Sequence, residues 1–292
     1  MGIKKIAIVT NFNIREKADA AARVAAYLNE YKCELFVSEL MREKVEKNEK
    51  LADIVKFIPN SSLYRAMDII IVLGGDGSIL TSARYCMSAG TPILGINLGR
   101  LGYMAEMEAD EIDMLSKLFD GSYQIEERGM LDVSVFRKGK QLLNRASALN
   151  DAVISNGSIA RMIDLELFED DSLVASYRAD GLILSTPTGS TAYSMSAGGP
   201  IIDPRMDCIC VTPICSHSLT ARPIVFSDKS LLTVKNTCER EKSLFLTLDG
   251  RVSFELYRGD TVRVKKSSFV TRLVRLKKQG FYKTLHSKMT TV

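Results

Sequence analysis

The stretch Ile69-Ile-Ile-Val-Leu-Gly74-Gly75-Asp76-Gly77-Ser78 decides the fold expected of this chain. Its run of five aliphatic residues is typical of a strand buried on both faces of a parallel sheet. Glycines end this strand, and the residues that follow, 77–89, have helical character, with Gly90 and Pro92 beyond them. A strand, a tight glycine turn and a helix together predict the repeating unit of an α/β sheet.

The same alternation of strand and helix continues on either side of this stretch. Short aliphatic runs predict further strands at 3–10, 33–37 and 91–97. Residues 18–30 carry alanine, valine and leucine at helical spacing, and the charged segment 42–56 predicts helix or loop. Strands and helices that alternate at these lengths indicate βαβ units. We therefore expect residues 1–126 to form a Rossmann-like α/β domain with a parallel sheet.

Beyond residue 126 the pattern changes to short strands in which polar and apolar residues alternate. Turns rich in glycine and aspartate separate many of these strands. The pattern predicts a β-rich second domain over residues 127–266, built as a β-sandwich. The last residues, 267–292, form a tail that we expect to pack back on the first domain, with a short helix over 281–289.

The composition excludes several classes of protein. The 292 residues are 46% hydrophobic and 25% charged, which excludes a disordered, collagen-like or coiled-coil chain. Because no apolar run approaches 18 residues and the N-terminus lacks the features of a signal peptide, we expect a cytoplasmic protein with no membrane segment. Nucleic-acid binding would require aromatic residues among the basic ones, or a larger surplus of charge than +4, so we expect no nucleic-acid partner.

Six cysteines and two histidines limit the chemistry further. The cysteines lie in apolar surroundings without framework spacing, which favours buried thiols in a reducing compartment. Cys208, Cys210, Cys215 and His217 are close enough in sequence to suggest a zinc cluster. Cys-x-Cys lacks the usual two-residue spacing, however, so we expect no metal site there. So few histidines exclude a mechanism that uses several of them.

The glycine turn after the buried strand has the character of a phosphate site. Gly74, Gly75 and Gly77 remove side chains where backbone must approach a ligand closely. The helix that follows directs free N–H groups and its dipole toward an anion. Asp76 lies at the carboxyl end of a central strand, where it could accept a hydroxyl proton or hold Mg²⁺. The alternative interpretation is a structural turn in which Asp76 caps the helix.

This turn matches neither of the two common nucleotide signatures. The chain has no G-x-x-x-x-G-K-[ST] motif and no G-x-G-x-x-G after its first strand. A Gly-Gly-Asp-Gly turn on a buried strand instead resembles a superfamily that contains the NAD kinases, the diacylglycerol and sphingosine kinases and, more distantly, the phosphofructokinases. These enzymes transfer a phosphoryl group to an alcohol, and the first domain is expected to share their parallel-sheet fold.

Further motifs select one family within this superfamily. The most specific is Asp180-Gly-Leu-Ile-Leu-Ser-Thr-Pro-Thr188-Gly-Ser-Thr191-Ala192-Tyr193-Ser-Met-Ser196-Ala-Gly-Gly-Pro200. It is accompanied by shorter motifs at 95–104, 150–151, 212–219, 222–224 and 248–250. In this order and spacing the set resembles the NAD kinases over roughly residues 66–255. The lipid kinases and the phosphofructokinases do not carry the long motif.

The resemblance implies roles for residues of the first domain. Asp76 would orient and deprotonate the 2′-hydroxyl of the adenosine ribose. Gly74, Gly75, Gly77 and Ser78 would line the phosphates, with Ser78 in place of the more usual threonine. Tyr103 would flank the adenine, and Met104 follows it where relatives often carry a second aromatic residue. Arg100 belongs to the same group, although an arginine here could also form a surface ion pair.

The resemblance also implies binding residues in the second domain. Asn150 and Asp151 would bond ribose hydroxyls, with Asp151 where many relatives carry glutamate. Thr191, Ala192 and Tyr193 would contact the adenine, and Thr188 would begin a helix that also binds ligand. Asp180 and Ser196 would lie near the nicotinamide half, with Asp180 reaching in from a neighbouring subunit. Arg178 lies two residues before Asp180 and would also contact the ligand. Arg178 could instead form a surface ion pair.

The expected reaction is the transfer of a phosphoryl group to NAD. The donor would be ATP, bound with Mg²⁺ or another divalent cation, or else polyphosphate, and the protein would form a homodimer or a homotetramer. A lipid kinase of the same superfamily is one alternative. A catalytically silent NAD(P)-binding regulator is another, although such a protein would be expected to have lost the acid at Asp76.

Overall fold

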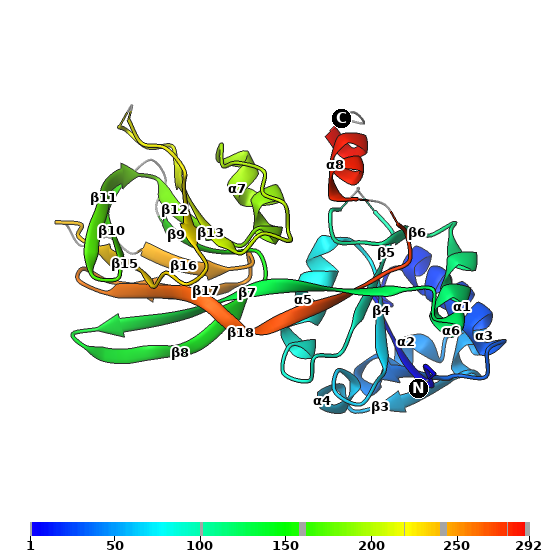
Figure 1. The fold of residues 1–292 in the computed structure, drawn as a ribbon. Coiled ribbons are helices and arrows are strands. Elements are labelled where there is room, and N and C mark those ends of the chain that lie inside the picture. The colour runs from blue at the N-terminus through cyan, green and yellow to red at the C-terminus, as the bar shows by residue number, and fades with distance from the viewer. Residues whose placement is uncertain are drawn as a thin grey trace. The chain divides into compact units, whose positions relative to one another are not determined.

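The computed structural model describes residues 2–99, 102–157, 162–218, 220–239, 244–278 and 280–289 (Figure 1). The chain divides into two compact units. Unit 1 contains Met1–Glu127 and Val270–Val292, and unit 2 contains Arg128–Phe269. The chain therefore passes from one unit to the other twice, inside β7 (Gln124–Arg137) and inside β18 (Thr261–Arg275).

Unit 1 is built on a parallel sheet in the order β3-β2-β1-β4-β5. All five residues of β4 are buried, as their aliphatic run predicts. The strands of this sheet, with the short β6 that pairs with β5, are β1 (Lys5–Val9), β2 (Glu34–Ser38), β3 (Val55–Ile58), β4 (Ile69–Leu73), β5 (Ile93–Asn97) and β6 (Met107–Glu108). The chain runs outward from β1 to β3 and then returns to β4 on the other side of β1. The strand order therefore reverses between β1 and β4.

Helices connect and cover these strands (Figure 1). The longest, α1, buries Ala20, Ala21, Val24, Ala25 and Leu28 on one face, which is the helical spacing seen in the sequence. The helices of unit 1 are α1 (Arg15–Asn29), α2 (Arg42–Val45), α3 (Glu49–Ala52), α4 (Asn60–Leu63), α5 (Asp76–Cys86), α6 (Lys117–Asp120) and α8 (Phe281–Met289), with two 3₁₀ turns at Glu39–Met41 and Ile112–Ser116. The expectation of helix or loop over 42–56 is wrong at its end, where β3 begins. This strand lies at the edge of the sheet and buries little, so its apolar pattern is weak.

The chain segment after residue 270 is fixed within unit 1. Leu273 pairs with Ile93 of β5 in a parallel register. The buried Glu106 carboxylate accepts the backbone N–H groups of Leu276 and Lys277 at 2.8 and 2.6 Å. It also pairs with Arg275 at 3.1 Å. These contacts attach the last strand to the loop that follows β5.

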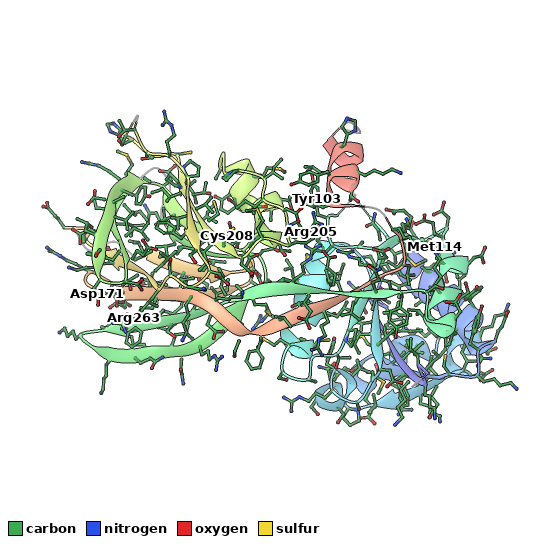
Figure 2. The ribbon with its side chains drawn as sticks, in the orientation of Figure 1. Tyr103, Met114, Asp171, Arg205, Cys208 and Arg263 are labelled. Carbon is green, nitrogen blue, oxygen red and sulfur yellow. The ribbon has the colours of Figure 1, made fainter. Side chains whose placement is uncertain are left out.

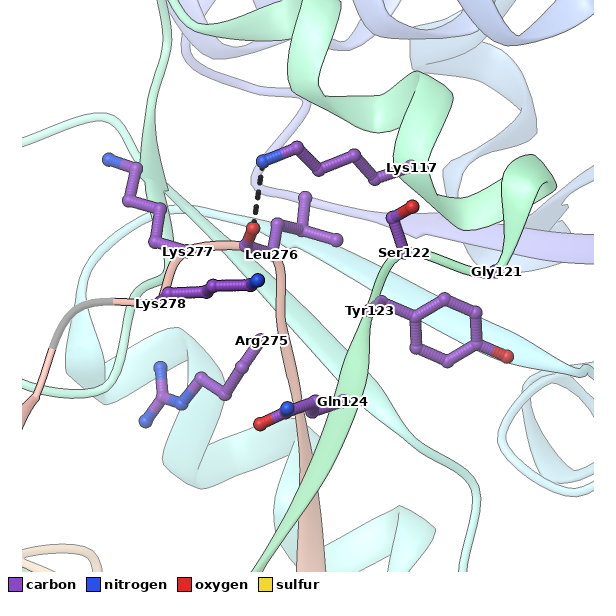
Figure 3. Close-up of a pocket in the computed structure, with 9 residues that line it drawn as sticks. All are labelled: Lys117, Gly121, Ser122, Tyr123, Gln124, Arg275, Leu276, Lys277 and Lys278. Atoms are coloured by element: carbon purple, nitrogen blue, oxygen red, sulfur yellow. Dashed lines mark hydrogen bonds between the residues drawn. The ribbon is translucent and has the colours of Figure 1, made fainter.

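A pocket of about 590 Å³ lies beside this segment (Figure 3). Its lining carries four cations, Lys117, Arg275, Lys277 and Lys278. Lys117 donates to the carbonyl of Leu276 at 2.9 Å, as the dashed line shows. Arg275 and Lys277 pair with carboxylates at 2.5 Å (Glu126) and 2.6 Å (Glu111). Much of the positive charge is therefore balanced locally, and these contacts hold the end of β18 in unit 1.

Unit 2 consists of antiparallel sheets. One has the order β14-β13-β12-β9-β16-β17, and its strands are β9 (Asp151–Asn156), β12 (Gly181–Ser185), β13 (Cys208–Ile214), β14 (Ile224–Ser227), β16 (Leu244–Leu248) and β17 (Val252–Leu256). The other strands are β7, β8 (Lys140–Ala148), β10 (Ile163–Glu169), β11 (Ser172–Ala179), β15 (Leu232–Asn236) and the first part of β18.

The core of unit 2 is formed by apolar residues from both sets of strands. Ile154 and Leu184 from one sheet join Leu165, Val234 and Val262 from the other in a single buried cluster. This arrangement is a β-sandwich, and it confirms the predicted fold class of an α/β N-terminal domain followed by a β-rich domain. Among the helices that the structure describes, none combines the length and hydropathy needed to cross a bilayer.

Candidate functional site

The Gly-Gly-Asp-Gly turn lies where the strand order of unit 1 reverses. Gly74 follows the last residue of β4, and the neighbouring strand β1 ends at Val9. The hydroxyl of Thr10 donates to the carbonyl of Leu73 at 2.8 Å, which joins the carboxyl ends of the two strands. In open α/β sheets, ligands bind outside the strand ends at such a reversal. The turn identified from sequence therefore lies at the edge where ligands of open α/β sheets typically bind.

Two glycines precede α5, and Gly77 and Ser78 belong to its first turn. Gly75 is the N-cap of α5, and a Cβ added there would meet no atom of the chain within 4 Å. Packing within the chain therefore does not require glycine at this position, whereas a ligand approaching the backbone would. Gly74 differs, because a Cβ there would lie 2.5 Å from the hydroxyl oxygen of Ser78. Gly74, Gly75, Gly77 and Ser78 thus surround the positive end of the α5 dipole.

Asp76 is held by backbone N–H groups from another loop. Its Oδ2 accepts the N–H of Tyr103 at 2.7 Å, and its Oδ1 accepts that of Met104 at 3.1 Å. Gly75, which has no side chain, is the N-cap of α5, and the Asp76 carboxylate accepts from the 103–104 backbone, so the interpretation of Asp76 as the helix cap is wrong. A carboxylate has about four acceptor positions, so each oxygen can still accept from a ligand hydroxyl. The carboxylate is oriented and remains able to act as a base.

The loop that holds Asp76 depends on a close approach at Gly102. A Cβ added to Gly102 would overlap the Asp76 carboxylate. Tyr103, labelled in Figure 2, belongs to this loop between β5 and β6, and it is half-buried. Met104 is 3% exposed and belongs to the core. Arg100, predicted from the same motif, lies outside the described residues.

In unit 2 the predicted ribose-binding residues form a buried corner between β8 and β9. Asn150 and Asp151 are 8% and 5% exposed. The side-chain oxygen Oδ1 of Asn150 is buried and has no hydrogen-bond partner among the described residues. A buried acceptor without a partner is costly in a folded protein, and it indicates a group that a ligand can satisfy.

The pKa of Asp151 is raised to about 7. Burial is the larger cause, and the neighbouring Asp249 carboxylate is the second. At neutral pH this carboxyl is therefore divided between its protonated and ionised forms.

The long sequence motif packs directly on this corner. A Cβ at Gly189 would overlap the carbonyl oxygen of Asn150, so the 3₁₀ turn Thr188–Thr191 can approach only because residue 189 is glycine. Thr188 accepts a hydrogen bond from Arg128 at 3.3 Å, and Thr191 is 8% exposed. Ala192 ends this turn, and the helix α7 (Tyr193–Ser196) follows. Tyr193 is 47% exposed and Ser196 is exposed, so both side chains are available to a ligand.

Two predicted residues lie away from this corner within unit 2. The pairing of β9 with β12 places Asp151 opposite Ser185 and Ser155 opposite Gly181. Asp180, which precedes Gly181, is therefore at the other end of these strands from Asp151. Arg178 is exposed, and its Nε lies 4.0 Å from Asp164 across the β10–β11 pair. The structure thus shows the loose surface ion pair that the sequence left open as an alternative for Arg178.

The structure also revises the description of the cysteines. Cys86, Cys208, Cys210 and Cys238 are buried, as predicted, whereas Cys33 is partly exposed. Cys215 is exposed because it follows β13 with a φ of 46°, a conformation that turns the chain out of the sheet. Within the described ranges no three His, Cys, Asp or Glu side chains are grouped so that they could hold a metal ion.

The sequence analysis placed Asp249 in the motif 248–250 and Thr186 in the long motif, but it did not assign either residue the role of building the corner around Asn150. Asp249 accepts N–H groups from three consecutive residues, 149–151. Thr186 donates its hydroxyl to the carbonyl of Leu149 at 2.6 Å and its N–H to that of Asn150 at 2.9 Å. Asp249 precedes Gly250 after a strand, a pattern that alone predicts only a hairpin turn. Its partners lie about 100 residues away, and no local signal identifies them.

Comparison with known proteins gives consistent matches over the whole chain. The family described as ATP-NAD kinase N-terminal domain matches residues 6–123, and the ATP-NAD kinase C-terminal domain matches residues 149–276. An NAD kinase of Caldanaerobacter subterraneus is 37% identical over 291 residues, 99% of each chain. An NAD kinase of Geotalea daltonii is 45% identical over 223 residues, 76% of this chain and 78% of its own.

Two solved structures share the fold. Yeast NADH kinase complexed with NADH aligns with a TM-score of 0.89 at 23% identity, covering 99% of this chain and 88% of its own. An NAD kinase from Archaeoglobus fulgidus in complex with ATP aligns with a TM-score of 0.74 at 24% identity, covering 99% of both chains.

Proposed function

The chain belongs to the NAD kinase family, a family of phosphotransferases, and we propose that it transfers the terminal phosphoryl group of ATP to the 2′-hydroxyl of the adenosine ribose of NAD. Membership of this family agrees with the resemblance predicted from the Gly-Gly-Asp-Gly turn and the long motif. It also removes the lipid-kinase alternative. The observation that best supports the assignment of the reaction to particular residues is the oriented carboxylate of Asp76 at the strand reversal.

Asp76 is proposed as the general base. A ribose hydroxyl is a poor nucleophile, so a base that removes its proton as the phosphoryl group transfers accelerates the reaction. The transition state of phosphoryl transfer is usually loose, and positioning with charge stabilisation supplies most of the catalysis. The hydrogen bonds from Tyr103 and Met104 fix the carboxylate without occupying all of its acceptor positions.

The phosphates of the donor are proposed to bind at the turn formed by Gly74, Gly75, Gly77 and Ser78. An open backbone at Gly75 and the positive end of α5 both suit a polyanion. Magnesium in nucleotide sites usually keeps several waters and binds mainly to the phosphates, so the cation would be held chiefly by the donor while Asp76 acts as the base. The cation would neutralise charge on the transferred group. Arg100 remains a predicted contact of the bound ligand. Polyphosphate remains an alternative phosphoryl donor to ATP.

The dinucleotide is proposed to bind through unit 2. The unpartnered Oδ1 of Asn150 and the carboxyl of Asp151 suit ribose hydroxyls. Thr188, Thr191, Ala192 and Tyr193 are proposed to contact the adenine, because the turn that carries them packs on the Asn150 carbonyl.

The nicotinamide half is proposed to meet Arg178, Asp180 and Ser196. Since Asp180 lies at the far end of β12 from Asp151, its contribution is proposed to reach the site of a second copy of the chain. That proposal requires the homodimer or homotetramer expected from sequence.

The reaction itself is tested by a coupled assay. The purified protein is incubated with ATP, Mg²⁺ and NAD, and NADP⁺ is detected with an NADP-dependent dehydrogenase. We expect NADP⁺ to accumulate with ATP, and parallel reactions with polyphosphate or with NADH identify the preferred donor and acceptor. Folded protein that binds NAD but forms no NADP⁺ would support the silent-regulator alternative instead.

The raised pKa of Asp151 predicts that the use of NAD depends on pH. If the ionised carboxyl accepts a hydrogen bond from a ribose hydroxyl, binding weakens as the pH falls through about 7. One pH unit below its pKa only about a tenth of the group is ionised, so KM for NAD should rise about tenfold between pH 8 and pH 6. Steady-state kinetics across this range measure the effect, with KM for ATP as the internal comparison.

The variant Asp151→Asn supplies the control, because its side chain does not titrate. Its KM for NAD should be nearly independent of pH, and a profile that keeps the wild-type inflection would contradict the assignment.

The thermal stability of Asp151→Asn gives a second test of the raised pKa. The folded-state pKa of Asp151 is above the ordinary aspartate value of about 3.9, so stability is lost progressively as the pH rises from about 4 to about 7. Asp151→Asn should therefore have a higher Tm than wild type at pH 8, and the difference should shrink toward pH 4.

A further inference from the structure

Three consecutive backbone N–H groups in unit 2 point at one carboxylate. Asp249 Oδ2 accepts from Leu149 at 2.9 Å, and Oδ1 accepts from Asn150 at 2.7 Å and from Asp151 at 3.2 Å. Successive N–H groups that converge on an anion form a concave site with strong, charge-assisted hydrogen bonds. Here the anion belongs to the protein itself, and the residue Asp249 is 8% exposed.

The backbone of Asp249 also forms a hydrogen bond with this corner. Its φ is 48°, in the left-handed region that aspartate tolerates better than most residues. Its N–H donates to the carbonyl of Asp151 at 3.0 Å. The residue is thus joined to the corner both through its side chain and through its main chain.

The carbonyl groups of residues 149 and 150 are also held by contacts within the chain. Thr186 donates to the carbonyls of Leu149 and Asn150, and Gly189 lies against the Asn150 carbonyl. The main-chain groups of the corner therefore have partners, whereas the side-chain oxygen of Asn150 has none among the described residues. A hydrogen-bonded backbone that presents a buried side-chain oxygen without a partner is the arrangement expected of a preorganised binding site.

We propose that Asp249 is a positioning residue for NAD: by binding the N–H groups of residues 149–151, its carboxylate sets the direction in which Asn150 and Asp151 present their side chains to the ribose. This inference rests on the proposed binding of the ribose by Asn150 and Asp151. Asp249 itself does not touch the reacting atoms in this proposal. It acts on substrate binding through the corner that it holds.

The charge of Asp249 gives the proposal a readout that a purely structural role would lack. Asp249 is the charged neighbour that acts on Asp151, and burial is the other cause of the raised pKa. Removing the charge should therefore lower the pKa of Asp151 and move the inflection of KM for NAD to lower pH.

The test is Asp249→Asn, which removes the charge and turns an NH₂ group toward at least one of the three donors. We expect KM for NAD to rise about tenfold, the size of one lost charge-assisted hydrogen bond, while kcat stays within about threefold and KM for ATP is unchanged. The inflection in KM for NAD should shift to lower pH. Unchanged KM for NAD and an unshifted inflection in a folded variant would overturn the proposal.

A second variant covers the case in which Asp249→Asn does not fold. Asp249→Glu keeps the charge but displaces the carboxylate by one methylene. It should raise KM for NAD several-fold with the inflection near its wild-type pH, and a wild-type KM would again overturn the proposal.

A matched control is Asp260→Asn. Asp260 is also a buried aspartate of unit 2, 1% exposed, and it accepts the N–H of Tyr257 at 2.8 Å. The loss of the Asp260 carboxylate should lower Tm without changing KM for NAD.

The variants Asn150→Ala and Asp151→Asn distinguish a failure of the proposed ribose site from a failure of the proposed role of Asp249. If neither changes KM for NAD, the proposed ribose site is wrong. If both do and the Asp249 variants do not, only the role of Asp249 is wrong.

Discussion

Asp76→Asn should reduce turnover by about 10²–10⁴-fold, the contribution of a positioned general base. Asparagine can accept a hydrogen bond from the ribose hydroxyl but cannot take its proton. Binding of NAD should stay within about tenfold of wild type, because the lost interaction develops mainly in the transition state. The coupled assay measures turnover, and isothermal titration calorimetry with NAD alone measures binding. Asp76→Ala should lose activity to a similar degree.

Asp68→Asn is the matched control for this substitution. Asp68 precedes the same strand, β4, and its Oδ2 also accepts two backbone N–H groups, from Lys4 at 2.8 Å and from Lys5 at 2.9 Å. Both variants therefore disturb a carboxylate held by main-chain donors in unit 1. Only Asp76→Asn should affect turnover. Near-wild-type turnover in Asp76→Asn would exclude this residue as the base.

Gly102→Ala should inactivate the enzyme almost as strongly while leaving the fold intact. The added Cβ would overlap the Asp76 carboxylate, and a carboxylate at the end of a side chain can rotate away at little cost in stability. Its oriented position would then be lost. Because a displacement of about 1 Å at a reacting group can cost about 10²-fold, we expect at least that loss in kcat with a Tm close to wild type.

Two further variants make this prediction specific. Gly129→Ala adds the same methyl group where no atom lies within 4 Å, so it should leave both activity and Tm unchanged. In the double variant Gly102→Ala/Asp76→Asn the losses should not multiply, because both changes remove the same function. Fully multiplicative losses would show that Gly102 acts on turnover by a route other than Asp76.

The elements that could be predicted from sequence are those with strong local patterns. The aliphatic run of β4, the helical spacing of α1 and the glycine turn each combine buried residues with clear ends. The strands β3, β14 and β17 were not predicted. They lie at sheet edges, where few side chains are buried and the apolar pattern is faint.

In the candidate site, too, only the features with a strong local sequence pattern could be predicted. The turn at Asp76 and the motif around Gly189 could be found because close backbone approaches require glycine in recognisable patterns. The residues Tyr103, Met104 and Asp249 all lie in motifs recognised from sequence, but their hydrogen bonds to Asp76 and to residues 149–151 could not be predicted. Each of these bonds involves a main-chain N–H group, which carries no side-chain signature, and joins residues 27 to 100 positions apart.

The two-segment construction of unit 1 has a consequence for synthesis on the ribosome. Residues up to Glu127 emerge first, but the partner of Ile93 on β5 and the N–H donors to Glu106 belong to residues after Val270. At about 5–20 residues per second, roughly seven to thirty seconds separate the two segments. During that interval part of the β5 edge is open and the Glu106 carboxylate lacks its main-chain partners. Unit 2 can therefore complete its fold on the nascent chain before unit 1, although unit 1 begins first.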